Sequence, residues 1–168
     1  ARTVRRRVFE VRCDTAFGPV MRCCAEATRQ HPDTWINGEI IRAYSELHDH
    51  GRAHSVESWL GDRLVGGIYG VALGGAFFGE SMFHRETDAG KVALVHLVAR
   101  LRLGRFRLFD IQFVTDHLRR FGAVEIAGRV YQRRLSDALS DSRDFPAAPN
   151  PQGFEGVLAG VIEHESGK

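Results

Sequence analysis

The sequence is poor in the features that mark secreted and membrane proteins. It has three cysteines among 168 residues, and Cys13, Cys23 and Cys24 form no C-x-x-C pair. An odd number cannot all be bridged within the chain, so a reduced, cytoplasmic setting is favoured over a secreted disulfide framework. The basic N-terminal residues are not followed by an apolar stretch, so no signal peptide is predicted.

A long hydrophobic run is also missing. The longest uncharged segment, residues 64–79, contains six glycines and falls short of the ~18–20 apolar residues that a membrane span needs. We therefore expect a soluble protein with no membrane partner. A hydrophobic content of 43% predicts one compact domain with a sizeable core.

The chain has no strong excess of one charge. Its formal net charge is +2, which creates no broad cationic field, so contact with nucleic acid has to come from local basic clusters. The run Arg5-Arg6-Arg7 is one such cluster. Its ordinary interpretation is a solvated arm, and binding of RNA phosphates is the alternative.

Residues 64–82, the segment LVGGIYGVALGGAFFGESM, organise the rest of the chain. Their period is closer to two than to 3.6, and the pair Gly74-Gly75 interrupts them, which predicts two buried strands joined by a tight hairpin. Residues 54–59 alternate as a third strand, joined to the hairpin at Gly61-Asp62. The carboxylate of Glu80 follows the most apolar part directly, so it must either reach solvent or belong to a site that uses it.

The remaining pattern predicts a strand over 8–13, helices over about 14–27, 39–50 and 91–103, and a strand over 107–114. A short helix over 116–120, a brief strand over 123–126 and a helix over 129–140 follow. Asp88 is the expected N-cap of the third helix. A helix between two strands implies a crossover to a parallel neighbour. We therefore predict an α/β fold, a GNAT-like mixed β-sheet with helices on both faces, over residues 1–140. Residues 141–168 are predicted to be a loosely structured C-terminal tail.

The strongest candidate for chemistry is Asp110-Ile111-Gln112. On a strand, Asp110 and Gln112 share one face while the other face is apolar. An edge strand with a solvated polar face would look the same, but the apolar surroundings favour an interior strand. Glu80 is the second candidate, with a surface ion pair to Arg85 as its ordinary interpretation. If the three converge, they form an anionic, hydrogen-bonding pocket for a cationic or amine group.

Two other constellations argue against a bound cofactor. Residues 85–90 occupy the place of the pyrophosphate-binding turn of GNAT enzymes, yet Glu86 and Asp88 stand there, which disfavours acetyl-CoA. The imidazoles of His48, His50 and His54 have no matching carboxylate or cysteine set, so we interpret them as surface histidines and predict no metal site.

Several segments together resemble those of leucyl/phenylalanyl-tRNA–protein transferases. They are WINGEI at 35–40, AYSELH at 43–48, AHSVESW at 53–59, LVGGIYGVALGGAFFGESMF at 64–83, KVALVHLV at 91–98 and DIQFVTDHLRRFGA at 110–123. The resemblance implies an enzyme that moves Leu, Phe or Met from aminoacyl-tRNA to the N-terminal Arg or Lys of proteins, marking them for degradation. It also implies a GNAT-like catalytic domain that uses no acetyl-CoA.

The resemblance assigns roles by position. Asp110 and Gln112 match the catalytic DxQ pair, in which Gln112 orients or relays the proton of the attacking amine and Asp110 polarises that arrangement. Glu80 matches the glutamate of GESMF and helps hold the substrate. The other implied substrate-binding residues are Trp35 beside the aminoacyl-adenosine and Ile68, Phe77, Leu94 and Phe109 around the donor side chain. The implied tRNA-binding residues are Arg5, Arg6, Arg7, Arg119 and Arg120.

The resemblance leaves alternatives open, because the family's N-terminal domain is expected before Val8 and is not found in this sequence. One alternative is a short tRNA-dependent transferase that aminoacylates a small-molecule amine. Another is an inactive tRNA- or protein-binding remnant, and an acetyl-CoA-dependent acetyltransferase ranks last.

Overall fold

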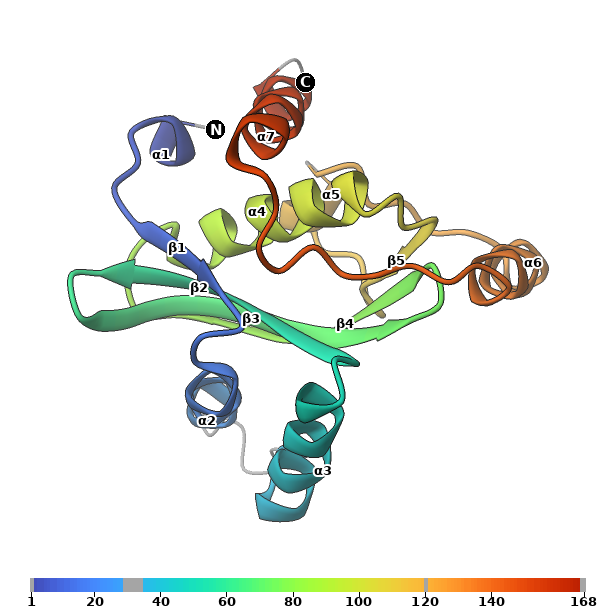
Figure 1. The fold of residues 1–168 in the computed structure, drawn as a ribbon, viewed down its shortest axis with the longest axis horizontal. Helices are drawn as coiled ribbons and strands as arrows, with labels where there is room; N and C mark the ends of the chain where they lie inside the picture. The colour runs from blue at the N-terminus through green and yellow to red at the C-terminus, as the bar shows by residue number, and fades with distance from the viewer. Residues whose placement is uncertain (1, 29–34, 120, 167–168) are drawn as a thin grey trace.

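A single mixed β-sheet forms the centre of the molecule. The computed structural model describes residues 2–28, 35–119 and 121–166 (Figure 1). The strands lie in the order β1-β2-β3-β4-β5, antiparallel from β1 to β4 and parallel between β4 and β5. Their bounds are β1 Glu10–Cys13, β2 Ala53–Leu60, β3 Arg63–Leu73, β4 Ala76–His84 and β5 Leu108–Asp110. The predicted three-strand meander and the parallel crossover strand are both confirmed.

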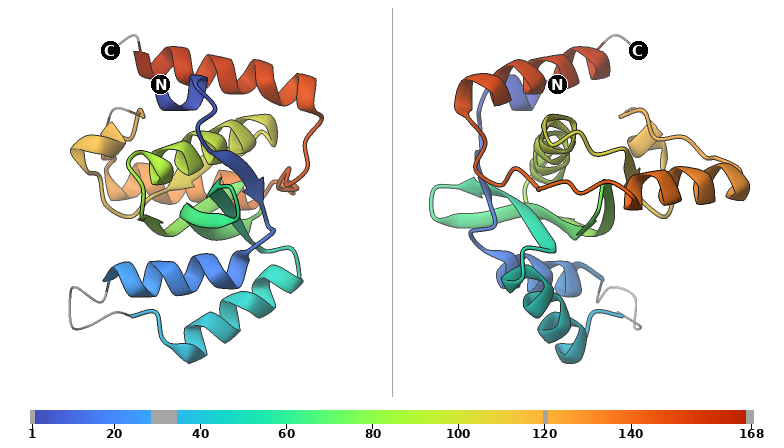
Figure 2. Two further views of the ribbon diagram at one scale, coloured as in Figure 1. Left: turned by 90° about the vertical axis from the view of Figure 1, so that its left-hand side faces the viewer. Right: turned by 45° about the vertical axis from the view of Figure 1, so that its right-hand side comes forward.

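Helices cover both faces of this sheet (Figures 1 and 2). On one face lie α2 (Phe17–Thr28) and α3 (Gly38–Asp49). On the other lie α4 (Ala89–Leu103), the short helices α1 (Arg2–Arg5) and α5 (Asp116–Arg119), and α7 (Pro151–Ser166). Helix α6 (Gly128–Leu139) stands beside β5, at the end of the sheet opposite the β2–β3 turn. The predicted GNAT-like architecture, with helices on both faces, is confirmed.

The alternation of side chains along β3 divides the core into layers. Tyr69 packs towards α2 and α3, in a cluster with Val20 and Met21. Its neighbour Ile68 packs towards α4, in a cluster with Leu94 and Leu97. This is the two-residue period of a strand buried on both faces. Among the described helices, none is long and apolar enough to cross a membrane.

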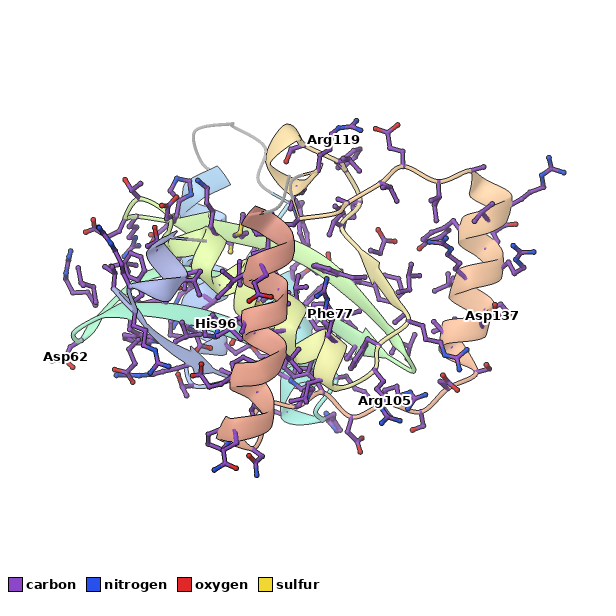
Figure 3. The ribbon with its side chains drawn as sticks, turned by 90° about the horizontal axis from the view of Figure 1, so that it is seen from above. Asp62, Phe77, His96, Arg105, Arg119 and Asp137 are labelled. Atoms are coloured by element: carbon purple, nitrogen blue, oxygen red, sulfur yellow. The ribbon has the colours of Figure 1, made fainter. Side chains whose placement is uncertain are left out.

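The C-terminal segment differs from its prediction. Residues 151–166 form helix α7 rather than a loosely structured tail. Phe154, Leu158, Val161 and Ile162 are buried in one cluster with the outer side of α4. His96 on α4 lies against Phe154, with ring centroids 5.6 Å apart (Figure 3). Both faces of α4 are therefore covered.

A start signal for α7 is present in the sequence. The side chain of Asn150 accepts hydrogen bonds from the backbone N–H groups of Gln152 and Gly153 at 3.0 and 3.4 Å. Pro151 occupies the first helical position, where a missing N–H is harmless. Three glycines within the helix weaken its apolar periodicity, which explains the wrong prediction.

The segment after α4 differs from its prediction in three ways. Strand β5 ends at Asp110 instead of continuing to 114. It lies at the edge of the sheet, and not in the interior. Residues 123–126, predicted as a strand, have no regular secondary structure.

Asp88, the expected side-chain cap of α4, has φ 66° and makes no side-chain capping bond. Its carboxylate instead accepts from Thr3 at 2.8 Å and pairs with Lys91 at 2.7 Å.

Candidate active site

The candidate site lies where two parallel strands separate. Strands β4 and β5 pair from Ala76 opposite Leu108 to Phe78 opposite Asp110, and the pairing stops there. Strand β4 continues to His84, while the chain after Asp110 turns away. A gap between separating strands exposes polar backbone groups that side chains can reach. Glu80 from β4 and Gln112 from the β5 exit both lie at this gap.

A β-bulge directs Glu80 into the gap. Tyr69 pairs with Ser81 and Gly70 pairs with Gly79, so Glu80 is an extra residue on β4. A bulge leaves one residue unpaired and re-aims its side chain, which lets Glu80 depart from the alternation of the strand. The opposite position has to be glycine, because a Cβ on Gly70 would lie 2.2 Å from the carbonyl oxygen of Phe78.

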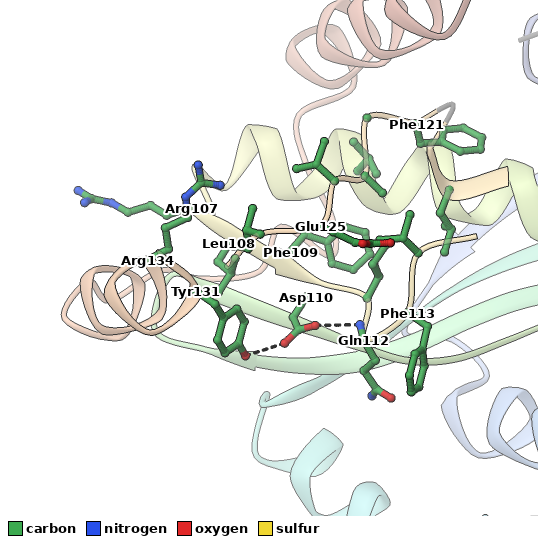
Figure 4. Close-up of a pocket in the computed structure, with 18 of the residues that line it drawn as sticks. Arg107, Leu108, Phe109, Asp110, Gln112, Phe113, Phe121, Glu125, Tyr131 and Arg134 are labelled. Atoms are coloured by element: carbon green, nitrogen blue, oxygen red, sulfur yellow. Dashed lines mark hydrogen bonds between the residues drawn. The ribbon is translucent and has the colours of Figure 1, made fainter. Parts of the chain in front are cut away.

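Asp110 holds the backbone of Gln112 in a tight turn. Oδ1 of Asp110 accepts a hydrogen bond from the backbone N–H of Gln112 at 2.8 Å (Figure 4). The N–H of Phe113 donates to the carbonyl of Ile111 at 2.6 Å, which makes Gln112 the central residue of a γ-turn. Its φ is 61°, in a region that a side chain occupies only at a cost. The prediction that Asp110 and Gln112 share one face of a strand is therefore wrong. The two residues meet through this turn instead.

The side chain of Gln112 bridges the gap to β4. Its Nε2 donates to Oε2 of Glu80 at 3.4 Å and to the carbonyl of Gly79 at 3.5 Å. Glu80 is also hydrogen-bonded to Tyr44 of α3. Burial raises the pKa of Glu80 above its ordinary value, the hydrogen bonds from Tyr44 and Gln112 lower it, and the charge of Asp110 raises it. Glu80 is not paired with Arg85, which binds Glu26 at 2.8 Å instead.

An aromatic group stands behind Glu80 on the α3 side. The ring of Tyr44 lies 6.3 Å from that of Trp35 and 5.8 Å from that of Tyr69, measured between centroids. Burial, followed by the neighbouring charge of Glu80, raises the pKa of Tyr44 to about 12, so its hydroxyl stays a donor at neutral pH. Trp35 is 45% exposed. Its ring contacts Tyr44, which in turn is hydrogen-bonded to the carboxylate of Glu80.

The four predicted lining residues of a donor pocket belong to one apolar cluster on the α4 side of the sheet. The rings of Phe77 and Phe109 lie 5.9 Å apart. Leu94 and Phe109 also line an open cavity of about 910 Å³ that includes Asp110 and Gln112. Ile68 and Phe77 are 6% and 0% exposed and do not line this cavity. The structure gathers the four residues, yet only two of them face open space.

The described part of the predicted tRNA-binding arginines falls into two groups, one at α1 and the turn after it and one on α5. Arg7 follows α1 and pairs with Glu155 of α7 at 3.1 Å. Arg119, on α5, pairs with Glu125 at 2.9 Å. Arg6 is exposed. Arg120 and the side chain of Arg5 lie outside the part of the chain that the structure describes.

The histidines of residues 48–54 have local partners. Nδ1 of His48 and of His50 contacts the backbone carbonyls of Ala53 and Glu46 at 2.8 and 2.7 Å. His54 is buried, contrary to the expected surface position, and its Nδ1 lies 2.7 Å from Oδ2 of Asp14. No group of three metal-binding side chains occurs among the described residues.

Two site residues are absent from the sequence-based predictions. Tyr44 binds Glu80 from α3, and Tyr131 of α6 donates to Oδ2 of Asp110 at 2.6 Å. The hydrogen bond to Asp110 is the main cause that raises the pKa of Tyr131. Both tyrosines belong to amphipathic helices, where an aromatic residue normally indicates packing. Nothing in the sequence distinguishes them from core residues.

The resulting network is continuous. It runs from Tyr44 to Glu80, Gln112, Asp110 and Tyr131. Asp110 and Gln112 line a partly apolar cavity, and Glu80 is hydrogen-bonded to Gln112, an arrangement that suits a substrate with an amine next to an apolar group.

Comparison with known proteins identifies close relatives by sequence. A family model described as leucyl/phenylalanyl-tRNA protein transferase matches residues 1–136. A protein of that name from Paramagnetospirillum magneticum is 62% identical over 144 residues, which cover 86% of this chain and 69% of the relative. Another from Phenylobacterium zucineum is 57% identical over 170 residues, covering 99% of this chain and 77% of the relative.

Comparison with solved structures concerns the fold alone. Two crystal structures of an aminoglycoside acetyltransferase from an uncultured soil metagenomic sample, with trehalose and with sisomicin, have TM-scores of 0.54 and 0.55. They are 11% and 12% identical in sequence, and the matches cover 71% and 73% of this chain and 92% and 93% of those chains. At such identity, a shared architecture does not imply a shared reaction.

Proposed function

This chain belongs to the leucyl/phenylalanyl-tRNA–protein transferase family, and we propose that it moves Leu or Phe from aminoacyl-tRNA to the N-terminal Arg or Lys of acceptor proteins, which marks them for degradation. Met is a further donor, because an apolar pocket separates related side chains by only about 1–3 kcal/mol per methylene. The observation that carries the proposal is the network of Glu80, Gln112 and Asp110 in a member of this family.

The reaction needs an amine held against an ester. The α-amine nitrogen of the acceptor attacks the ester carbonyl carbon, a C–N bond forms, and the bond to the ribose oxygen of tRNA breaks. The amine loses a proton, and the leaving ribose oxygen gains one. The ester is already activated, so orientation of the amine and removal of its proton supply the catalysis without a covalent enzyme intermediate.

Gln112 and Glu80 are the groups that we assign to the amine. Because Nε2 of Gln112 donates to Glu80, its Oε1 is left to accept a hydrogen bond from the amine N–H. The Glu80 carboxylate attracts the cationic form of the amine, and its burial makes it a stronger base than an exposed glutamate. Asp110 acts through Gln112, since both of its oxygens already accept hydrogen bonds.

The donor aminoacyl group is assigned to the apolar cavity beside this network. Leu94 and Phe109 line the cavity, and we propose that Ile68 and Phe77 form its inner wall when the donor side chain enters. The exposed ring of Trp35 is suited to stack on the terminal adenine of the tRNA. Arg5, Arg6, Arg7, Arg119 and Arg120 are the proposed contacts to tRNA phosphates, and the cytoplasm is the proposed location.

We also propose that the enzyme uses no acetyl-CoA and no metal. Asp88 directly precedes α4 and its carboxylate stands at the helix N-terminus, where a phosphate would otherwise bind. A Cβ on the facing Gly66 would lie 2.6 Å from Cβ of Ala89, so the start of α4 packs tightly on β3. This packing and the acidic side chain oppose a pyrophosphate at this turn.

A transfer assay tests the proposal directly. The chain is incubated with radiolabelled Leu-tRNA or Phe-tRNA and a peptide that begins with Arg, and incorporation into the peptide is measured. We expect transfer to this peptide and none to the same peptide with an acetylated N-terminus or an N-terminal Asp. Absence of transfer with either donor would reject the proposal, and transfer to free small-molecule amines in preference to the peptide would assign a different acceptor. Measurable binding of acetyl-CoA would overturn the cofactor assignment.

A further inference from the structure

Helix α6 contributes one side chain to the network, and it is the hydroxyl of Tyr131. We propose that Tyr131 is a positioning residue for aminoacyl transfer: it fixes the carboxylate of Asp110, and through it the turn at Gln112 that presents the side-chain amide to the amine. The hydroxyl donates to Oδ2 of Asp110 at 2.6 Å (Figure 4). This inference rests on the proposed function, because Gln112 is placed there at the reacting amine.

The two oxygens of Asp110 have separate tasks. Oδ1 accepts from the backbone N–H of Gln112, and Oδ2 accepts from Tyr131. A carboxylate with one occupied oxygen can still rotate about its Cβ–Cγ bond, because that torsion is broad and shallow. A second donor on the other oxygen removes this freedom. Tyr131 therefore decides which way Oδ1 points.

The turn at Gln112 needs such support. Its φ of 61° is costly for a residue with a side chain, and strained backbone persists only where surrounding contacts over-determine it. The turn is closed by the bond from Phe113 to Ile111, and the bond to Asp110 is the side-chain contact that holds the N–H of its central residue. If Asp110 rotates, we expect Gln112 to relax towards an ordinary conformation and its amide to leave Glu80.

The position of Tyr131 is itself fixed by the β3–β4 turn. The backbone N–H of Gly75 donates to the carbonyl of Ala138, near the end of α6, at 2.7 Å. The carbonyl of Gly75 accepts from the N–H of Arg107, directly before β5, at 2.8 Å. One residue thus anchors both the helix that carries Tyr131 and the strand that ends in Asp110. The ring of Tyr131 also packs in a small cluster with Leu135, Ala76 and Leu108.

Steady-state kinetics of the full chain with Phe-tRNA and the Arg-starting peptide test the inference. Tyr131→Phe keeps the packed ring and removes only the hydroxyl, so we expect kcat to fall about tenfold with KM for the peptide nearly unchanged. Leu135→Ala is the matched control, since it removes packing from the same cluster without contacting Asp110. We expect it to lower the unfolding midpoint and to change kcat by no more than about twofold.

A double-mutant comparison separates positioning from a general structural effect. If Tyr131 acts through Gln112, Tyr131→Phe should have almost no further effect on the residual rate of Gln112→Ala. Three results would overturn the inference: an unchanged kcat in Tyr131→Phe, a loss in Leu135→Ala as large as in Tyr131→Phe, or a full tenfold loss in the Gln112→Ala background.

Hydrogen exchange gives a readout that does not depend on activity. In the wild-type chain, the Gln112 amide is bonded to Asp110, and we expect Tyr131→Phe to speed its exchange at least tenfold while the amides of β4 keep their rates. An inactive wild type would refute the proposed function, and the exchange rates would still decide on Tyr131. Equal exchange at Gln112 in both proteins would overturn the inference by itself.

Discussion

Asp110 accepts a hydrogen bond from the backbone N–H of Gln112 at 2.8 Å, and this bond holds Gln112 at φ 61°. The relationship gives Asp110 a geometric task, because its carboxylate keeps the neighbouring carboxamide across the gap between β4 and β5. The charge of Asp110 strengthens the two bonds that it accepts, since hydrogen bonds to ionised groups are the stronger class.

The first prediction compares two substitutions of Asp110. Asp110→Ala removes both accepted hydrogen bonds. We expect a loss of about 2–3 kcal/mol of transition-state stabilisation, which lowers kcat by a factor of about 30–150. Asp110→Asn retains an oxygen for the Gln112 N–H and should lose less. Rate measurements on both variants, with circular dichroism to verify the fold, provide the check. Equal losses would show that the charge of Asp110 matters and the turn does not.

The second prediction concerns Glu80 and stability. Because the pKa of Glu80 is raised in the folded chain, the folded state binds more protons than the unfolded state between the ordinary pKa and the raised one. The contribution of Glu80 to the free energy of unfolding therefore falls as pH rises through this window, whereas that of His96, whose burial lowers its pKa to about 4, rises with pH. In urea unfolding, the free energy of unfolding of the wild type minus that of Glu80→Gln should therefore fall as pH rises above the ordinary pKa of a glutamate.

Glu10 provides a control of opposite sign for this measurement. Its pKa is lowered, mainly by the hydrogen bond from Arg12. The contribution of Glu10 to the free energy of unfolding is fully present above the ordinary pKa of a glutamate and is lost as pH falls through its lowered pKa. The free energy of unfolding of the wild type minus that of Glu10→Gln should therefore rise with pH instead of falling. If the difference between the wild type and Glu80→Gln does not fall as pH rises, the assignment to Glu80 is wrong.

The third prediction concerns the pH dependence of activity. The hydrogen bond from Tyr44 favours ionised Glu80 and lowers its pKa. Tyr44→Phe should therefore move the acid limb of kcat/KM to higher pH. Tyr69→Phe makes the same chemical change on the adjacent ring, whose buried hydroxyl has no hydrogen-bond partner among the described residues. That variant should leave the limb in place, and a shift in both would contradict the assignment.

The fourth prediction compares the glycines of two hairpins. Gly74 and Gly61 have similar φ values of 58° and 59°. A Cβ on Gly74 would lie 2.8 Å from the carbonyl of Asp141, whereas one on Gly61 would meet nothing within 4 Å. Gly61→Ala should cost only backbone strain, about 1 kcal/mol, and Gly74→Ala about 2–3 kcal/mol because α6 has to move. Urea unfolding measures the stability lost in each variant. Equal losses would mean that α6 moves to accommodate the added Cβ at no cost.

The fifth prediction tests the docking of α7. Phe154 is 8% exposed and lies under the guanidinium of Arg100. The Cζ atom of Arg100 is 4.7 Å from the centroid of the Phe154 ring. Phe154→Ala should lower the free energy of unfolding by about 3 kcal/mol. Gly160→Ala, where the added Cβ meets nothing within 4 Å, should raise it by up to about 1 kcal/mol through helix propensity. If Phe154→Ala costs less than 1 kcal/mol, α7 contributes little to the fold.

Local patterns were sufficient to predict most of the elements. The apolar alternation around Gly74-Gly75 predicts β3, the turn and β4, because hairpin pairing depends on residues adjacent in sequence. The stripe of α4 and the following Gly104 predict that helix and its end. The quoted segments predict the family, and Asp110, Gln112 and Glu80 are brought together as expected.

The sequence by itself determined the antiparallel meander, the parallel crossover and three residues of the network, because these follow from periodicity, turn chemistry and short motifs. Only the tertiary structure decided that β5 ends at Asp110, where pairing with β4 stops. It alone placed Tyr44 and Tyr131 at the carboxylates, since contacts between distant helices and strands leave no local pattern. The stretch after Asp110 alternates like a strand, yet it forms a turn, which the long-range bonds from Tyr131 to Asp110 and from Gln112 to Glu80 hold in place.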